Sequence, residues 1–95
     1  MQKLTTTIKR EWLKEIVARR KKIEYREIKP YWEKRLAGLE KPFHLRLING
    51  MRKKAPEVTV LIKRVVRNRA KRQFELHIGA VLTVKNWDIK RERPR

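Results

Sequence analysis

A chain of 95 residues is long enough for one hydrophobic core and too short for two, so we expect a single domain. The chain has 28 lysines and arginines but only 10 aspartates and glutamates, which gives a formal net charge of +18. This charge exceeds what solubility requires and favours a polyanionic partner. The composition excludes a membrane-spanning helix, because no apolar run is long enough, and it excludes disulfides and a serine nucleophile, because cysteine and serine are both absent.

The first part of the chain predicts strand, helix, strand and helix in that order. Residues 3–8 are rich in β-branched side chains and predict a short strand or extended arm. Residues 9–20 carry apolar side chains at helical spacing and predict the main amphipathic helix, with Trp12 in the core. Residues 22–28 alternate charged and apolar side chains, as a half-buried strand does, and Pro30 then suits the first turn of a short helix.

Two further strand patterns follow in the middle of the chain. Residues 43–48 alternate again and end at Asn49-Gly50, a pair that commonly forms a tight turn. Residues 58–66 have the β-branched enrichment of a long strand, with a β-bulge expected near Lys63-Arg64. We therefore expect two strands joined by a basic loop.

The last part of the chain predicts two more strands and a tail. Residues 74–78 and 81–84 are separate strands divided by Gly79-Ala80, and residues 90–95 predict a flexible basic tail. One main helix, one short helix and five to six strands describe an α+β domain over residues 1–89. A chain this short with that many strands tends to curl into a small β-barrel.

The segment that joins the main helix to the next strand resembles the signature region of the ASCH domain family. It reads RRKKIEYR from Arg19 to Arg26, and KPYW follows at residues 29–32. The family motif is Gly-x-Lys, four further residues and Arg. This chain is similar at Lys21 and Arg26 and has an arginine in place of the glycine.

The resemblance covers roughly residues 4–87, because the Asn49-Gly50 turn and a late strand ending near Gly79 also fit. It implies a PUA-like β-barrel with a cleft beside the motif that accepts RNA or a modified nucleoside. Some similar proteins deacetylate acetylated cytidine, and at least one resembles a ribonuclease. The deacetylating members match this chain at Lys21, but they use a threonine where Glu24 stands here, so their hydroxyl is missing.

Lys21, Glu24 and Arg26 are the catalytic candidates if the cleft turns over a substrate. Glu24 and Arg26 lie two apart on the predicted strand and project to one face, opposite Ile23 and Tyr25. Glu24 could act as a general base while Arg26 holds a phosphate through two hydrogen bonds. Alternatively, Glu24 and Arg26 form a structural ion pair and Lys21 is a solvated phosphate contact.

Basic and aromatic residues interleave elsewhere in the chain. Tyr31 and Trp32 sit among cations, which suits unstacked bases beside phosphates, and we expect one ring in the core and the other exposed. Residues 41–74 carry eleven lysines and arginines and a single acid, Glu57, so this stretch is the stronger electrostatic footprint. The candidate nucleic-acid contacts are Arg19, Arg20, Lys21, Lys22, Arg26, Lys29, Tyr31, Trp32, Arg35, Arg52, Lys53, Lys54, Arg67, Arg69, Lys71 and Arg72.

Three functions are consistent with these residues. The first is an RNA-binding module whose cleft receives a nucleotide, with RNA as the expected partner and DNA as the second choice. The second is a metal-independent ribonuclease or a nucleoside amidohydrolase that uses the same cleft. The third is a basic protein that binds DNA or joins a ribonucleoprotein without any pocket.

We expect neither a cofactor nor a metal, because His44 and His77 lie on separate strand segments without cysteines or an acidic cluster beside them. Residues 1–7 are polar and lack the apolar centre of a secretory signal, so a cytoplasmic location is expected. The default expectation is a monomer that does not bind membranes.

Overall fold

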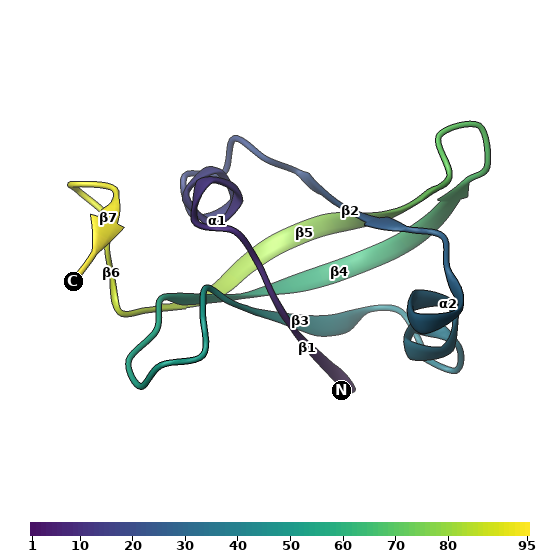
Figure 1. Cartoon of the computed structure of the whole chain (residues 1–95), viewed down its shortest axis with the longest axis horizontal. Coiled ribbons are helices and arrows are strands. Elements are labelled where there is room, and N and C mark those ends of the chain that lie inside the picture. Colours follow the sequence, from purple (N-terminus) through teal and green to yellow (C-terminus); the bar gives the residue numbers. More distant parts are fainter.

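A strongly curled five-stranded sheet with a helix at each end forms the protein (Figure 1). The computed structural model describes all residues, 1–95. The elements in chain order are β1 (Lys3–Thr7), α1 (Arg10–Val17), β2 (Ile23–Glu27), α2 (Pro30–Leu36), β3 (Phe43–Ile48), β4 (Glu57–Asn68), β5 (Gln73–Lys85), β6 (Trp87–Asp88) and β7 (Arg93–Pro94). The expected α+β class with two helices is confirmed, although the two helices are nearly equal in length, at 8 and 7 residues. Neither helix is long and apolar enough to cross a membrane.

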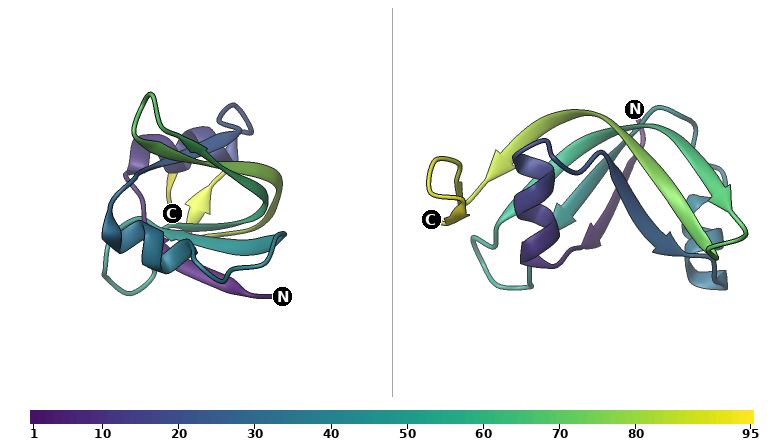
Figure 2. Two further views of the ribbon diagram at one scale, coloured as in Figure 1. Left: turned by 90° about the vertical axis from the view of Figure 1, so that its right-hand side faces the viewer. Right: turned by 90° about the horizontal axis from the view of Figure 1, so that it is seen from above.

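The sheet order is β1-β3-β4-β5-β2, with β1 parallel to β3 and every other pair antiparallel. Three register shifts interrupt the β4–β5 pairing, and one of them leaves Lys63 without a partner between Ile62 and Arg64. Bulges bend a strand and increase its twist, so these irregularities curl the two long strands (Figure 2). The expected bulge near Lys63-Arg64 is confirmed, and the sheet is a half-barrel with β1 and β2 as its edges.

One prediction for the C-terminal strands is wrong. Residues 74–78 and 81–84 belong to one continuous strand, β5, rather than to two strands divided by Gly79-Ala80. Another register shift falls here, because Leu61 pairs with Ala80 while Ile62 pairs with Ile78 and skips the glycine. Gly79 therefore lies at a bend of the strand and does not end it.

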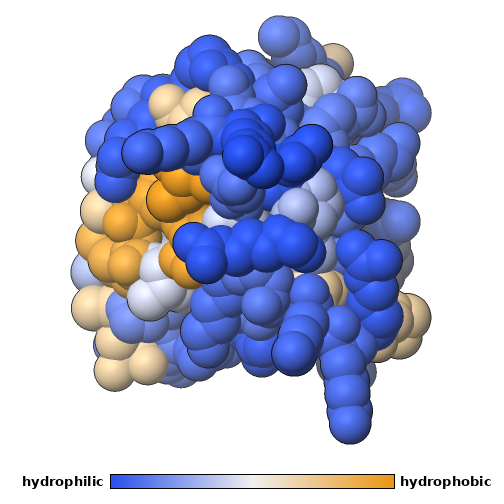
Figure 3. All heavy atoms as spheres, turned by 90° about the vertical axis from the view of Figure 1, so that its left-hand side faces the viewer, coloured by the Kyte–Doolittle hydropathy of each residue, from blue (hydrophilic) through white to orange (hydrophobic).

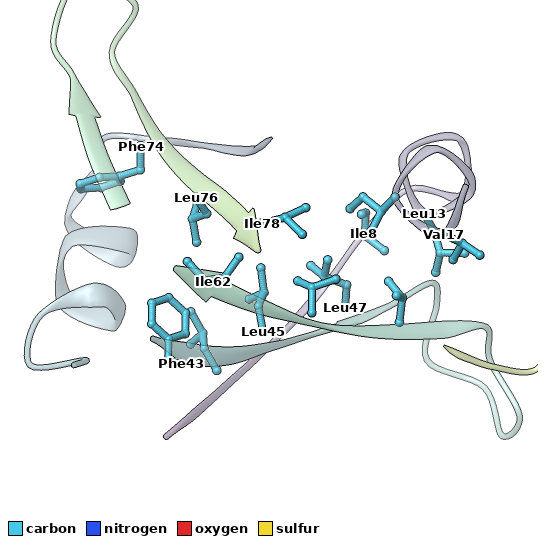
Figure 4. Close-up of a cluster of buried hydrophobic side chains, with 14 of the residues drawn as sticks. Ile8, Leu13, Val17, Phe43, Leu45, Leu47, Ile62, Phe74, Leu76 and Ile78 are labelled. Atoms are coloured by element: carbon cyan, nitrogen blue, oxygen red, sulfur yellow. The ribbon is translucent and has the colours of Figure 1, made fainter. Parts of the chain in front are cut away.

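The hydrophobic core fills the inside of the curl (Figure 4). Side chains from β3, β4 and β5 form its centre, α1 covers one end and α2 covers the other. From α1, Leu13, Ile16 and Val17 face the core, whereas Trp12 is 46% exposed. The expectation that Trp12 is a core residue is therefore wrong. Only a narrow stripe of α1 packs on the core, and the indole of Trp12 lies outside this stripe.

The C-terminal segment folds back on itself and does not form the loose tail expected for residues 90–95. β6 and β7 pair as a small hairpin, in which Trp87 is buried in the core. Glu92 forms a salt bridge with Arg20 at 2.8 Å, and the backbone N–H of Arg95 donates to the carbonyl of Asn86 at 3.3 Å. These contacts attach the segment to the end of α1 and to its own start.

Candidate nucleic-acid interface

A left-handed residue ends α1 and turns the chain toward β2. Arg19 has φ +63°, its N–H donates to the Ile16 carbonyl at 2.9 Å, and the N–H of Arg20 donates to the Glu15 carbonyl at 3.0 Å. This pair of bonds is the Schellman pattern, which glycine usually completes because it lacks a Cβ. The arginine that replaces the glycine of the resembled motif thus adopts the conformation that glycine favours. The turn leads directly into Lys21.

A buried carboxylate joins the two other catalytic candidates, Lys21 and Arg26. Glu24 is 4% exposed. Its Oε2 accepts from Arg26 Nε at 3.1 Å and from Arg26 Nη2, and its Oε1 lies 3.6 Å from Lys21 Nζ. Burying a carboxylate is costly unless cations and hydrogen bonds compensate, and here two cations do so.

The two faces of β2 are occupied in an unexpected way. Glu24 and Arg26 point inward, while Ile23 is half-buried and Tyr25 is 43% exposed. The reason is the position of β2 at the sheet edge, where its inner side faces the gap toward β1. Arg26 Nη2 crosses that gap and donates to the Thr7 carbonyl at 2.9 Å.

Aromatic rings surround the two cations of this ion-pair cluster. Lys21 Nζ lies 5.3 Å from the ring centroid of Trp12 and 4.8 Å from that of Tyr25. The guanidinium carbon of Arg26 lies 5.1 Å from the centroid of Trp32. Trp12 and Tyr25 are both nearly half exposed, so their outer edges and faces remain open to a ligand.

These side chains line a cleft of about 900 Å³, which we call the main cleft. Its volume lies within the range of roughly 300–1,000 Å³ that is typical of ligand sites. Its walls come from the end of β1, from α1, β2 and α2, and from the turn after β3. The lining residues are Thr7, Ile8, Lys9, Trp12, Lys21, Glu24, Tyr25, Arg26, Glu27, Lys29, Trp32, Asn49 and Gln73.

A second cleft of about 560 Å³ lies on the other side of β1, beside the loop that joins β3 to β4, and we call it the loop cleft. Thr7 is common to both clefts. The lining residues are Thr5, Thr6, Thr7, Tyr31, Arg35, Arg46, Ile48, Gly50, Met51, Arg52, Lys54, Ala55, Glu57 and Asn86.

An ion pair closes the floor of the loop cleft. Arg46 Nε donates to Glu57 Oε2 at 2.8 Å, and Arg46 Nη2 donates to Glu57 Oε1 at 2.8 Å. The hydrogen bonds from Arg46 hold the pKa of Glu57 below its usual range and raise the pKa of Arg46. Because Glu57 is bound by Arg46, the other cations of the loop cleft have no acidic partner within its lining.

Half of the sixteen predicted nucleic-acid contacts line one of the two clefts. In the main cleft are Lys21, Arg26, Lys29 and Trp32. In the loop cleft are Tyr31, Arg35, Arg52 and Lys54. As expected for the two adjacent rings, Trp32 is buried and Tyr31 is exposed. Outside both clefts are Arg19, Arg20, Lys22, Lys53, Arg67, Arg69, Lys71 and Arg72.

Two of the outlying arginines are held by carboxylates of the protein itself. Hydrogen bonds from Arg20 to Glu15 and then to Glu92 raise the pKa of the arginine. Arg67 Nη1 lies 2.5 Å from Glu33 Oε1, and the guanidinium of Arg67 also stacks 4.9 Å from the ring centroid of Phe74. These two side chains are less available to a ligand than their sequence position indicates.

Trp12, Tyr25, Arg46, Asn49 and Gln73 line the clefts although sequence reasoning did not select them. The helical spacing of the sequence assigns Trp12 to the apolar stripe of α1, and the alternation of β2 assigns Tyr25 to the face opposite the motif cations. No signal in the sequence distinguishes Arg46, Asn49 or Gln73 from ordinary strand and turn residues.

Polar and charged side chains dominate the surface at one end of the molecule. Figure 3 views the side of the molecule that carries the C-terminal hairpin and the loop between β3 and β4, and hydrophilic residues cover most of it apart from one apolar area.

No protein-family model, curated protein or solved structure matches this chain significantly.

Proposed function

We propose that the protein is an RNA-binding domain of the PUA-like, ASCH type, and that its main cleft receives one unstacked base with its phosphate. The observation that carries the proposal is the enclosure of the Lys21 ammonium by the half-exposed rings of Trp12 and Tyr25. Flat rings beside cations are the usual platform for single-stranded nucleic acid. The net charge of +18 supplies the long-range attraction.

The lining of the main cleft supports a division of labour. A base would stack on Trp12 or Tyr25, while Lys9 and Lys29, which are exposed at the cleft, would contact phosphate. The side-chain amide of Gln73 offers both donors and an acceptor to a base edge. Bases within a duplex cannot reach the rings, so a single strand or a loop is the favoured form of the ligand.

The ion pairs of the cleft favour binding over turnover. Glu24 uses one carboxylate oxygen for Arg26 and the other for Lys21, so its proton-accepting sites are already engaged. Lys21 likewise faces a carboxylate and two rings, contacts that suit an ammonium rather than a base. A ribonuclease or nucleoside amidohydrolase in this cleft would first have to separate these groups.

Replacement of the cleft rings tests the proposal. We expect Trp12→Ala and Tyr25→Ala each to weaken binding of single-stranded RNA by about 5- to 150-fold, because stacking on an aromatic side chain contributes roughly 1–3 kcal/mol per base. Fluorescence anisotropy with end-labelled oligonucleotides measures the affinity, and circular dichroism checks folding. Leu82→Ala is the control, because Leu82 is an exposed apolar side chain outside both clefts.

Three results would contradict this proposal. If both ring variants bind RNA as the unmodified chain does, while changes at 67–72 abolish binding, the protein binds nucleic acid without a pocket. If RNA or acetylcytidine is turned over, and Glu24→Gln abolishes turnover without unfolding the protein, the cleft is catalytic. A preference for DNA in competition experiments would replace RNA as the partner.

A further inference from the structure

The loop cleft has no part in the binding of a single base in the main cleft, yet it directly adjoins that cleft. Thr7 of β1 lines both clefts, and two arginine side chains contact carbonyls of this strand. Arg26 donates to the Thr7 carbonyl at 2.9 Å, and Arg35 donates to the Thr5 carbonyl at 2.7 Å, so two guanidiniums cover carbonyls of β1.

One indole supports both of these arginines. The guanidinium carbon of Arg26 lies 5.1 Å from the Trp32 ring centroid, and that of Arg35 lies 5.8 Å from it. Trp32 is 6% exposed and lines the main cleft, whereas Arg35 lines the loop cleft. The two clefts therefore share Thr7 of β1 and adjoin one stacked cluster of side chains.

The loop cleft also has the chemistry to receive a nucleotide. Arg52 and Lys54 are exposed on the loop between β3 and β4, and no acidic residue of the protein pairs with either. Tyr31 is 53% exposed, and its ring lies 5.4 Å from the guanidinium carbon of Arg35. The only carboxylate in the lining, that of Glu57, is already bound by Arg46. Unpaired cations with an open ring suit a phosphodiester and a base, and they do not suit a cation.

We propose that the loop cleft binds the nucleotide adjacent to the one in the main cleft, so that the ligand is a strand of at least two nucleotides crossing β1 at Thr7. The inference rests on the proposed function, because it takes the main cleft as the first subsite. It also defines the ligand class more narrowly, since a lone modified nucleoside would occupy the main cleft and leave the loop cleft unused.

The experiment compares ligands of increasing length. A ribonucleoside 5′-monophosphate, a dinucleotide and a tetranucleotide are titrated into the full chain and followed by NMR amide shifts at low ionic strength. We expect the mononucleotide to shift amides of residues 21–26 only, and the dinucleotide to shift amides of residues 50–55 in addition. The affinity should rise by about tenfold or more from one nucleotide to two, because the second contact becomes intramolecular.

The loop supplies a matched set of variants. Arg52 and Lys54 line the loop cleft, whereas Lys53 lies between them in sequence, is equally exposed and lines neither cleft. We expect Arg52→Ala and Lys54→Ala each to weaken dinucleotide binding by about three- to tenfold, because each loses a phosphate contact and the counterion released with it. Mononucleotide binding should not change. Lys53→Ala removes the same charge and should change dinucleotide binding by less than about twofold.

The possible outcomes separate the inference from the proposed function. If the mononucleotide shifts residues 21–26 but Arg52→Ala and Lys54→Ala behave like Lys53→Ala, the loop cleft is not a subsite and the main cleft stands. Equal losses for mononucleotide and dinucleotide would also overturn the second subsite. If neither ligand shifts residues 21–26 and Trp12→Ala leaves RNA affinity unchanged, the proposed function itself fails.

Discussion

Arg19 shows how a single backbone conformation can shape the start of the main cleft. Its φ of +63° lies in the left-handed region, where a Cβ costs roughly 1–2 kcal/mol and glycine costs little. The Schellman hydrogen bonds require this conformation, so Arg19 adopts it at a cost in backbone strain. The side chain itself is exposed and lines neither cleft.

Glycine at this position should therefore stabilise the protein. We expect Arg19→Gly to raise the free energy of unfolding by about 1 kcal/mol, since the relief of strain exceeds the extra entropy of glycine in the unfolded chain. Urea denaturation at neutral pH measures the change. Arg19→Ala is the control, because it removes the same charge and keeps the Cβ. Equal stability of the two variants would assign the effect to charge rather than to the backbone.

Glu57 links the stability of the molecule to pH. Its pKa is lowered, chiefly by the hydrogen bonds from Arg46. A carboxyl whose pKa falls on folding contributes stability above its unfolded value, which is about 4.3 for glutamate, and the contribution disappears as the pH falls through the folded value. The contribution is therefore complete at neutral pH and is lost in acid.

Glu57→Gln should expose this dependence. We expect the variant to unfold at a lower urea concentration than the unmodified chain at pH 7, and the difference to shrink as the pH drops from about 5 to 3. Glu40→Gln is the matched control, because Glu40 is exposed and forms no ion pair. If the stability difference between Glu57→Gln and the unmodified chain stays constant across this pH range, the titration of Glu57 does not cause it.

At the scale of elements, the sequence identifies most helices and strands and fails where tertiary structure decides. The alternation of residues 43–48 predicts β3, and Pro30 predicts the start of α2, because both signals are local. Gly79 reads equally as the end of a strand or as a bend within one. Only the pairing with β4, which places a register shift there, decides between the two.

In the candidate site, too, the sequence identifies what local patterns determine and misses what tertiary structure determines. Lys21, Arg26 and Trp32 are found from the sequence because they lie within one short segment. Tyr25 is missed because a period of two shows which residues share a face but not which face turns inward. The curl of the sheet brings β1 opposite β2, and the inner side of β2 then holds ion pairs rather than apolar side chains.

At the scale of the molecule, the dominant feature is the excess of positive charge. Most of the acidic residues already form ion pairs within the chain, so the remaining cations face solvent and one another. The principal extents are 37 × 23 × 21 Å, and the Debye length at 0.1 M salt is about 10 Å. Repulsion is therefore felt between neighbouring patches at low salt and is screened at high salt.

Salt should act in opposite directions on stability and on binding. Between 0.05 and 0.5 M sodium chloride, values chosen to span the screening range, we expect the Tm of the free protein to rise because self-repulsion is screened. Over the same range, log affinity for RNA should fall against log salt with a slope of roughly −4 to −7 if about five to eight phosphates are contacted. Thermal melts and anisotropy titrations measure the two effects. A flat binding curve would remove the electrostatic basis of the proposal.

The different environments of the three indoles provide an optical reporter inside the protein. Trp32 and Trp87 are 6% and 3% exposed, whereas Trp12 is 46% exposed and forms a wall of the main cleft. We therefore expect emission from Trp12 to lie to the red of emission from the other two, because water relaxes around its excited state. If a base stacks on that ring as proposed, it should quench the red component selectively, so that occupancy of the cleft can be followed without a dye.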